Sequence, residues 1–266
     1  MPTDAPADLE QRVRELSTEE RRRLARVAIG LLDLTTLEGT DTPDRVRALC
    51  RRALAPLESD PGLRCASVCV YPAMVPCAAE SLARTPVRVA SVAAAFPSGQ
   101  YPLKVKLLDC AEAIRAGADE LDIVINRGLF LAGRHDEMAA EVREIRAATR
   151  GVHLKVILET GELETPDNIR RAAELVAAEL DDGDMLKTST GKAKVNATPE
   201  AARILLETAR ASGRALGFKP AGGVRTTDQA LLYVLLAREI LGPDALNPDR
   251  LRIGASTLLD DLLANL

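Results

Sequence analysis

Histidine is scarce in this 266-residue sequence: only His135 and His153 occur, and they lie in different segments. Zinc sites in proteins draw heavily on histidine and cysteine ligands. A histidine-rich zinc site would therefore be hard to assemble here. We expect neither histidine to be catalytic and no metal to be bound.

Cysteine is sparse as well. The five cysteines, at positions 50, 65, 69, 77 and 110, are odd in number, and no pair has the Cys-x-x-Cys spacing. Disulfide frameworks use paired cysteines in oxidising compartments, and redox and zinc motifs use the closer spacing. We therefore expect reduced, mostly buried thiols with a structural role.

Long apolar segments are missing. No stretch approaches the ~18 apolar residues of a membrane span, and the start, MPTDAPADLEQRVREL, lacks the apolar core of a secretory signal. The formal net charge of -4 gives no general attraction to nucleic acid or to an anionic membrane. We expect a soluble, cytoplasmic protein without a nucleic-acid or membrane partner.

Lysine is the fourth scarce residue, since it supplies only seven of the 35 basic side chains and arginine supplies the others. Two of the seven, Lys187 in DMLKTSTGK and Lys219 in LGFKPAGG, end apolar segments directly before glycine-containing turns. An amine can lose its proton near neutral pH when its surroundings favour this, whereas a guanidinium cannot. The placement of the two lysines suggests covalent chemistry on a carbonyl group.

What is present in abundance is an alternation of short β-type runs with amphipathic helical segments. Parallel strands need such crossover helices, and eight strands roughly thirty residues apart favour an α/β fold of the (β/α)8 TIM-barrel type. A doubly wound sheet is the alternative, but no GxGxxG motif favours it. We expect one domain over residues 1–266, with strands at 31–35, 67–71, 88–92, 121–126, 154–159, 184–189, 215–219 and 251–254.

Helix starts are readable in several places. Three Thr-Pro pairs, at 42–43, 165–166 and 198–199, put a capping hydroxyl before a proline at the first helical position. Ser17 followed by Glu20 is typical of a capping box. It predicts an extra helix in an N-terminal extension, residues 1–28, that packs on the barrel.

Charged residues in the predicted strands converge on the barrel interior. Alternate side chains of a strand face opposite sides, so the apolar residues of LDIVIN and HLKVILE turn Asp122, Lys155 and Glu159 inward. Lys187 and Lys219 end two later strands, where barrels gather their functional groups. A purely structural buried ion-pair network is the alternative, and it stays open for Lys155 and Glu159. For the whole set it is weaker, because buried charges are costly unless paired or used.

Lys187 and Lys219, at the ends of their predicted strands, can activate one another. For Lys187 to attack a carbonyl near pH 7, its pKa must fall from about 10.4 by roughly three units, or about 4 kcal/mol. A second ammonium ~5 Å away supplies about 3 kcal/mol at an effective dielectric constant of about 20, and partial desolvation supplies the rest. Because this effect is symmetric, electrostatics leaves open which lysine is the nucleophile.

Three turns are candidate anion sites. Residues 190–192, 221–223 and 254–257 follow the sixth, seventh and eighth predicted strands, and each contains glycine. Glycine lets backbone N–H groups approach a phosphate closely, and barrels often hold phosphate in the last two of these loops. The Gly191-Lys192 pair is not a Walker A loop, because Leu186 and Ala193 stand where glycine and Ser or Thr are needed.

These motifs together resemble the deoxyribose-phosphate aldolase family over about residues 28 to 262. The resemblance is carried by LLDLTTL, VCVYP, GADELDIVIN, LKVILETGEL, LKTSTGKAKVNATPEAARILLE, GFKPAGGVRT and RIGASTLL. It implies a class I aldolase that reversibly cleaves 2-deoxy-D-ribose 5-phosphate to acetaldehyde and D-glyceraldehyde 3-phosphate, in deoxyribonucleotide catabolism.

The resemblance also implies residue roles. Lys187 matches the Schiff-base lysine. Lys219 matches the lysine that lowers the pKa of the Schiff-base lysine and aids proton transfer, and Asp122 matches the acid/base aspartate. No metal or organic cofactor is implied, and a homodimer or homotetramer is. The implied substrate- and phosphate-binding residues are Asp33, Thr190, Gly191, Lys192, Gly222, Gly223, Gly254 and Ser256.

Two other functions remain in view. The lysine pair and the anion turns would also suit another Schiff-base aldolase, or a transaldolase, acting on a phosphorylated keto sugar. A barrel that binds sugar phosphates without turning them over is the alternative from a different class. Asp122, Lys187 and Lys219 together favour an enzyme over this binding protein.

Overall fold

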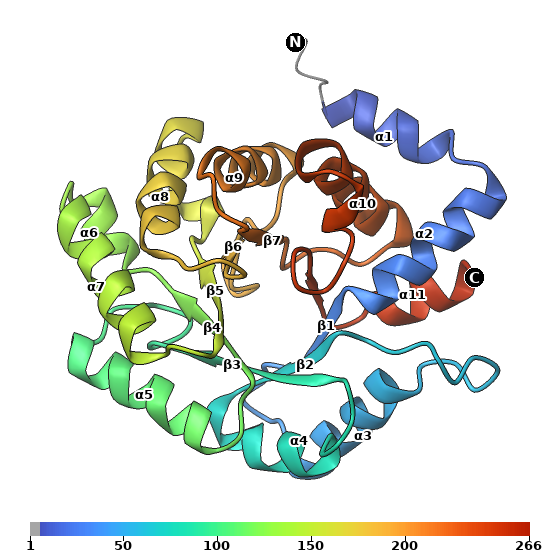
Figure 1. Cartoon of the computed structure of the whole chain (residues 1–266), viewed down its shortest axis with the longest axis horizontal. Coiled ribbons are helices and arrows are strands. Elements are labelled where there is room, and N and C mark those ends of the chain that lie inside the picture. The colour runs from blue at the N-terminus through green and yellow to red at the C-terminus, as the bar shows by residue number, and fades with distance from the viewer. Residues whose placement is uncertain (1–5) are drawn as a thin grey trace.

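Eight parallel strands form the centre of the computed structural model, which describes residues 6–266 (Figure 1). The first seven strands pair in sequence order, and the first also pairs with the eighth, as expected of a (β/α)8 TIM barrel. The strands are β1 Leu32–Thr35, β2 Ser67–Val70, β3 Arg88–Ala93, β4 Glu120–Val124, β5 His153–Ile157, β6 Met185–Lys187, β7 Gly217–Lys219 and β8 Ile253–Ala255.

Helices surround the strands in a ring (Figure 1). They are α1 Pro6–Arg14, α2 Thr18–Gly30, α3 Pro43–Leu54, α4 Val75–Ser81, α5 Leu103–Arg115, α6 Arg127–Leu131, α7 His135–Ala148, α8 Pro166–Glu179, α9 Pro199–Ala211, α10 Thr227–Leu241 and α11 Leu258–Ala264. Three short 3₁₀ turns, η1 Pro72–Met74, η2 Thr160–Glu162 and η3 Pro243–Ala245, lie in the connections.

The barrel closes between β7 and the segment leading into β8. The amide of Phe218 donates to the carbonyl of Arg250 at 2.9 Å, and the amide of Arg252 donates back to Phe218 at 3.1 Å. One step further along, the amide of Gly254 donates to the carbonyl of Pro220 at 2.9 Å. These bonds bring the loops after β7 and β8 side by side, which is what a shared binding site at that end requires.

The strands divide their side chains as the alternation of residues predicts. Leu121, Ile123, Leu154 and Val156 face outward and belong to the main apolar core under the helices. A separate small cluster fills the inside of the barrel near β2 and β3, and it consists of Leu37, Cys69, Ala90 and Val92, with Tyr71 and Phe96 packed against it. Charged side chains occupy much of the rest of the interior, together with the uncharged Val124, Ile157 and Met185.

The predicted helix starts are confirmed. The hydroxyls of Thr42, Thr165 and Thr198 each accept a hydrogen bond from the amide three residues later, with proline at the first helical position. Such caps satisfy backbone donors that have no partner within the helix. The crossover helices of the barrel are therefore started by local sequence signals.

The extra N-terminal helix is also confirmed, and a second helix precedes it. The Ser17 hydroxyl accepts from the amide of Glu20 at 3.2 Å and starts α2, which packs on α10 and α11. In α1, Leu9 and Val13 are buried, and this helix lies against α10. Residues 1–5 of the predicted extension lie outside the described residues.

The cysteines are as predicted. All five are free thiols; Cys77 is half-buried and the other four are buried. Burial raises the pKa of the Cys69 thiol to about 11, so this side chain inside the barrel is a neutral packing group near neutral pH.

Within residues 6–266, no helix is both long enough and apolar enough to cross a membrane.

Candidate active site

A layer of charged side chains fills the barrel interior from β1 and from β4 to β8. Each of its members is at most 3% exposed. Three are acids and four are bases, and all belong to strands or adjoin them on the inner side. The charged layer consists of Asp33, Glu120, Asp122, Lys155, Lys187, Lys219 and Arg252.

Asp122 lies at the centre of this charged layer. Its Oδ1 accepts a hydrogen bond from Lys155 Nζ at 2.8 Å. Its Oδ2 accepts from Lys187 Nζ at 2.6 Å and from Lys219 Nζ at 2.7 Å. The two lysines singled out from the sequence thus contact one oxygen of the predicted acid/base residue.

The two lysines differ in their other contacts. Lys219 Nζ also donates to Asp33 Oδ2, so this ammonium lies between two carboxylates. Burial disfavours its charge, but Asp122 and Asp33 outweigh burial and hold the pKa of Lys219 above its usual range. Lys219 is therefore a stable cation.

Within residues 6–266, Lys187 has only Asp122 as a carboxylate partner. Burial is the largest influence on it, and together with the charge of Lys219 it outweighs Asp122, so the pKa of Lys187 lies below its usual range. The symmetry assumed from the sequence is wrong, because Asp33 stabilises one ammonium and not the other. The expected order of the influences that lower the pKa of Lys187 is also wrong: desolvation is the larger one and the neighbouring cation Lys219 the smaller.

The charge count of the layer agrees with this asymmetry. With every group ionised, four cations would face three carboxylates; with Lys187 as a neutral amine, the charges balance. Arg88 also reaches Glu120, but its side chain is 43% exposed and pairs with the surface residue Asp249. An uncompensated buried charge is costly, so the proton on Lys187 is the one most easily lost.

Two members of the layer were missed in the sequence. Arg252 donates to Glu120 at 3.0 Å and 2.5 Å and to Asp33 at 2.6 Å. Burial raises the pKa of Glu120, but Lys155 and Arg252 outweigh burial and hold this pKa well below its usual range. The sequence pattern could have identified Glu120, because it stands two residues before Asp122 and therefore lies on the same, inward face of the strand.

Lys155 belongs to the ion-pair network. It contacts Glu120 at 2.6 Å as well as Asp122, and it is fully buried. Burial lowers the pKa of Lys155, and the surrounding carboxylates Asp122, Glu120 and Asp33 raise it, with a net rise. The sequence left open whether Lys155 is a functional residue or part of a purely structural ion-pair network. These contacts favour the ion-pair network.

Above the charged layer lies a cavity of about 470 Å³ at the C-terminal end of the strands. Lys187 is the member of the layer that lines it, whereas Asp33, Asp122 and Lys219 lie beneath its floor. The other predicted residues that line it are Thr190, Gly191, Lys192, Gly222, Gly223, Gly254 and Ser256. Lining residues that the sequence analysis missed include Arg45, Asn196 and Arg225.

Glycine is required at one of these turns in particular. Gly222 has φ +78°, and a Cβ placed there would lie 2.5 Å from Oδ1 of Asn196. Ala221 is bridged to Gly254, so the turns after β7 and β8 meet. Bare backbone therefore faces the cavity on this side.

Glu159 supports the neighbouring turn. It lies two residues after β5 with φ +55°, and its carboxylate accepts hydrogen bonds from the amide of Thr190 at 3.2 Å and from the Thr190 hydroxyl. The same hydroxyl accepts from the amide of Lys192 at 3.0 Å. Burial raises the pKa of Glu159, and the bonds from Thr190 oppose the rise. Glu159 thereby fixes the turn 190–192 and does not line the cavity itself.

Carboxylates gathered in a barrel can also ligate a metal ion. Within residues 6–266, no three His, Cys, Asp or Glu side chains are grouped in a way that could hold one. The three acids of the layer are instead neutralised by the protein's own cations.

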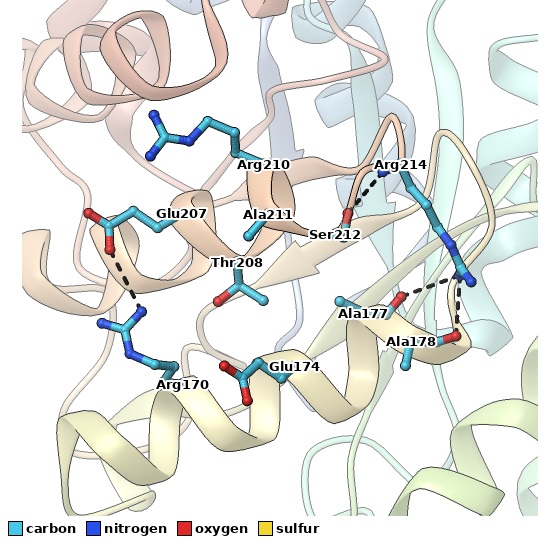
Figure 2. Close-up of a pocket in the computed structure, with 10 residues that line it drawn as sticks. All are labelled: Arg170, Glu174, Ala177, Ala178, Glu207, Thr208, Arg210, Ala211, Ser212 and Arg214. Atoms are coloured by element: carbon cyan, nitrogen blue, oxygen red, sulfur yellow. Dashed lines mark hydrogen bonds and ion pairs between the residues drawn. The ribbon is translucent and has the colours of Figure 1, made fainter.

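A second cavity, of about 640 Å³, lies outside the barrel between α8 and α9 (Figure 2). Arg170 pairs with Glu207 across it at 3.7 Å, and Arg214 donates to the carbonyl of Ala178 at 3.2 Å. These contacts join α8 to α9 and to the segment that follows α9 (Figure 2). No member of the charged layer lines this cavity, so it is separate from the candidate active site.

Comparisons with known proteins agree with this geometry. Residues 27–263 match the profile of a family described as DeoC/LacD family aldolase. The deoxyribose-phosphate aldolase of Homo sapiens is 43% identical over 250 residues, covering 88% of this chain and 78% of the relative. That of Agrobacterium fabrum is 40% identical over 250 residues, covering 93% of both chains.

A solved structure is similar as well. The tetrameric deoxyribose phosphate aldolase of Aeropyrum pernix superimposes with a TM-score of 0.72 at 28% identity. The match covers 99% of this chain and 98% of that one.

Proposed function

The chain belongs to the DeoC/LacD aldolase family, and we propose that it cleaves 2-deoxy-D-ribose 5-phosphate reversibly to acetaldehyde and D-glyceraldehyde 3-phosphate. The observation that carries the proposal is a buried lysine with a lowered pKa at the floor of a cavity, beside a carboxylate and a second, permanently charged lysine. A Schiff-base aldolase, which is an aldehyde-lyase, needs these groups: a neutral amine as nucleophile, an acid/base group and a cation that keeps the amine neutral.

In the proposed reaction, the neutral amine of Lys187 attacks C1 of the open-chain sugar. Loss of water gives an iminium ion, which acts as an electron sink. The bond between C2 and C3 then breaks as a base removes the proton of the 3-hydroxyl, and the electron pair of that bond forms an enamine on C2. Protonation of C2 and hydrolysis of the iminium release acetaldehyde and restore the lysine.

Asp122 and Lys219 are proposed to move the protons. Asp122 contacts both lysines through one oxygen, so it can exchange a proton with either the amine or the nearby substrate hydroxyl. Lys219 stays charged and disfavours a second ammonium at Lys187. Asp33 is proposed to act from beneath the floor by keeping Lys219 charged, and not through contact with the phosphate.

The phosphate is proposed to lie on the turns at the cavity rim. Gly222, Gly223 and Gly254 present backbone there, and Gly191, Lys192 and Ser256 lie on the same cavity. Lys192 pairs with Glu38 at 3.3 Å and remains partly exposed, so a phosphate can compete for it. The side chain of Arg225 adds a further positive charge to the lining.

A reductive trapping experiment tests this function. Borohydride added in the presence of acetaldehyde or deoxyribose 5-phosphate should fix an acetaldehyde-derived ethyl group on the peptide that contains Lys187. Lys187→Met should abolish the label, and Lys192→Met should retain it. Labelling only by dihydroxyacetone phosphate or a ketose phosphate would instead assign the chain to another Schiff-base aldolase or a transaldolase.

Three further properties belong to this proposal. The reaction needs no metal or organic cofactor, because the iminium itself is the electron sink. The site of action is the cytoplasm, where deoxyribonucleotides are degraded. The active form is a homo-oligomer.

A further inference from the structure

A hollow lies at the end of the barrel opposite the candidate active site. It has a volume of about 470 Å³, and it is formed by the C-terminal half of α2 and by residues that precede or begin β2, β3 and β8. The active-site cavity is instead lined by strand ends and by the turns that follow them, so the charged layer lies between the two spaces. The basal hollow, as it is called below, is lined by residues that include Arg26, Gly30, Arg64, Arg88, Asp249 and Arg252.

Four arginines make the basal hollow basic. Arg26, Arg64 and Arg88 are exposed at least in part, and Arg252, which is 0% exposed, lies at its floor. Among the lining residues in the described part of the chain, Asp249 is the one acid. Guanidinium groups bind the oxygens of phosphates and carboxylates through paired N–H donors. The lining therefore favours an anion.

Arg64 is the unmatched cation of the basal hollow. It is exposed on the segment that leads into β2 and, within residues 6–266, it has no ion-pair partner. Arg26 pairs with Asp60, and Arg88 pairs with the surface residue Asp249 at 2.9 Å. The side chains of these two arginines are 50% and 43% exposed, and exposed ion pairs are weak in water. An anion with several charges can therefore compete for both.

The floor of the basal hollow is fixed. Arg252 donates to Glu120 at 3.0 Å and 2.5 Å and to Asp33 at 2.6 Å, so its guanidinium is held inside the charged layer and its charge is matched there. The movable donors are the three outer arginines, which come from α2, from the segment before β2 and from the start of β3. A tetrahedral phosphate offers oxygens in several directions, whereas a planar carboxylate accepts mostly in its own plane. Donors from three segments thus favour phosphate.

The basal hollow has room for more than an inorganic ion. Its volume lies within the range of about 300 to 1,000 Å³ that is typical of small-molecule sites. Gly30 contributes to this space, because a Cβ placed there would meet no atom within 4 Å. The occupant is therefore expected to carry an organic part beside its phosphate.

We propose that the basal hollow binds a small phosphate-bearing metabolite, with Arg26, Arg64 and Arg88 around the phosphate. This site is separate from the phosphate site proposed at the turns after β6, β7 and β8. The inference goes beyond the proposed aldolase reaction and does not depend on the chemistry at Lys187.

Isothermal titration calorimetry with pyrophosphate tests the proposed site. Arg64→Gln should raise the dissociation constant by about tenfold or more, because it removes a charge-assisted contact. Arg22→Gln is the matched control, since Arg22 is exposed on α2 but does not line the basal hollow. It removes the same charge and should change the dissociation constant by less than about twofold.

Two further variants test the location by other means. Gly30→Leu keeps all four arginines and fills the open space, so it should weaken pyrophosphate binding as strongly as Arg64→Gln does. Asp249→Asn should have the opposite effect and lower the dissociation constant by about threefold, because it removes a carboxylate that competes for Arg88. Circular dichroism checks that each variant is folded.

Three results would overturn the inference. Pyrophosphate binding that survives Arg64→Gln and Gly30→Leu but is lost in Arg225→Gln would place the anion in the active-site cavity. Equal weakening by Arg22→Gln would show a general attraction to surface charge. Malonate that binds as tightly as pyrophosphate would show that phosphate is not selected.

Catalysis provides a separate reading of the same samples. Arg64→Gln should keep kcat/KM for deoxyribose 5-phosphate within about twofold of the wild type, because Arg64 lies on the far side of the charged layer. A parallel loss of cleavage and pyrophosphate binding would contradict two separate sites. Failure of the reductive label at Lys187 would instead overturn the proposed reaction and leave the pyrophosphate result standing.

Discussion

Lys187 and Lys219 are register partners on β6 and β7, and both donate to the same oxygen of Asp122, yet their pKa values are displaced in opposite directions. Burial, assisted by Lys219, lowers the pKa of Lys187. Lys219 is equally buried, but Asp122 and Asp33 together raise its pKa. The contact with Asp33 thus separates a proposed nucleophile from a proposed electrostatic partner.

Removing the charge of Lys219 should move the pH dependence of catalysis. In Lys219→Met, the three buried carboxylates keep only two permanent cations, so the pKa of Lys187 should rise. The acidic limb of kcat/KM, which reports loss of the proton from the free enzyme's amine, should shift by about one pH unit or more to higher pH. Activity should fall as well, because Lys219 is proposed to aid proton transfer. An acidic limb that stays in place would contradict the electrostatic role.

Asp33→Asn should destabilise the fold. The pKa of Asp33 is depressed: burial raises it, but Lys219, Arg252 and Lys155 outweigh burial. A carboxyl with a depressed folded pKa stabilises the protein above its unfolded value of about 3.9, and this contribution is lost as the pH falls towards the folded value. Near pH 7 we expect a loss of about 3–5 kcal/mol in the free energy of unfolding, since buried cations lose their partner.

Denaturant unfolding at pH 7 measures this loss. Asp44→Asn is the control, because the Asp44 side chain is 95% exposed and pairs with Arg47 on the same helix. It should change the free energy of unfolding by less than about 0.5 kcal/mol. Equal effects of the two substitutions would show that the charged layer does not depend on Asp33.

Glu159→Gln should weaken substrate binding more than turnover. The Thr190 amide lies near both oxygens of the Glu159 carboxylate, so glutamine turns an NH₂ group towards one of these donors and offers a single, uncharged acceptor oxygen to both; the turn 190–192 should therefore loosen. We expect KM for deoxyribose 5-phosphate to rise about tenfold, equivalent to about 1.4 kcal/mol, with a smaller change in kcat.

Steady-state kinetics with two substrates separate this positioning role from general damage. Non-phosphorylated deoxyribose should show little change in KM with Glu159→Gln, because it makes no phosphate contact. Glu162→Gln serves as the control, since Glu162 is 46% exposed on the same loop. A parallel loss for both substrates would indicate a structural role instead.

Local signals in the sequence predicted most of the fold. The Thr-Pro caps and the alternating strands depend on neighbouring residues, and they appear where expected. Strand ends were less accurate: the fourth strand begins at Glu120 and not at Leu121, and this one-residue difference hid Glu120 from the charged layer. The organisation of the chain as one domain stays a prediction.

The charged layer was predictable only in part. Alternation turned Asp122 inward, and the glycine turns marked Lys187 and Lys219. The decisive contacts, however, join residues far apart in sequence, such as Lys219 with Asp33 and Arg252 with Glu120. They follow from closure of the barrel, in which β8 lies beside β1 and also meets β7, and no local pattern encodes this closure.

Titration of the lysine side chains by NMR tests the central claim most directly. With ¹³C at the ε-carbon, only seven lysine signals are expected, and Lys187→Met identifies one of them. That signal should titrate below the usual lysine value of about 10.4. A Lys187 signal that stays protonated up to pH 10 would contradict the account.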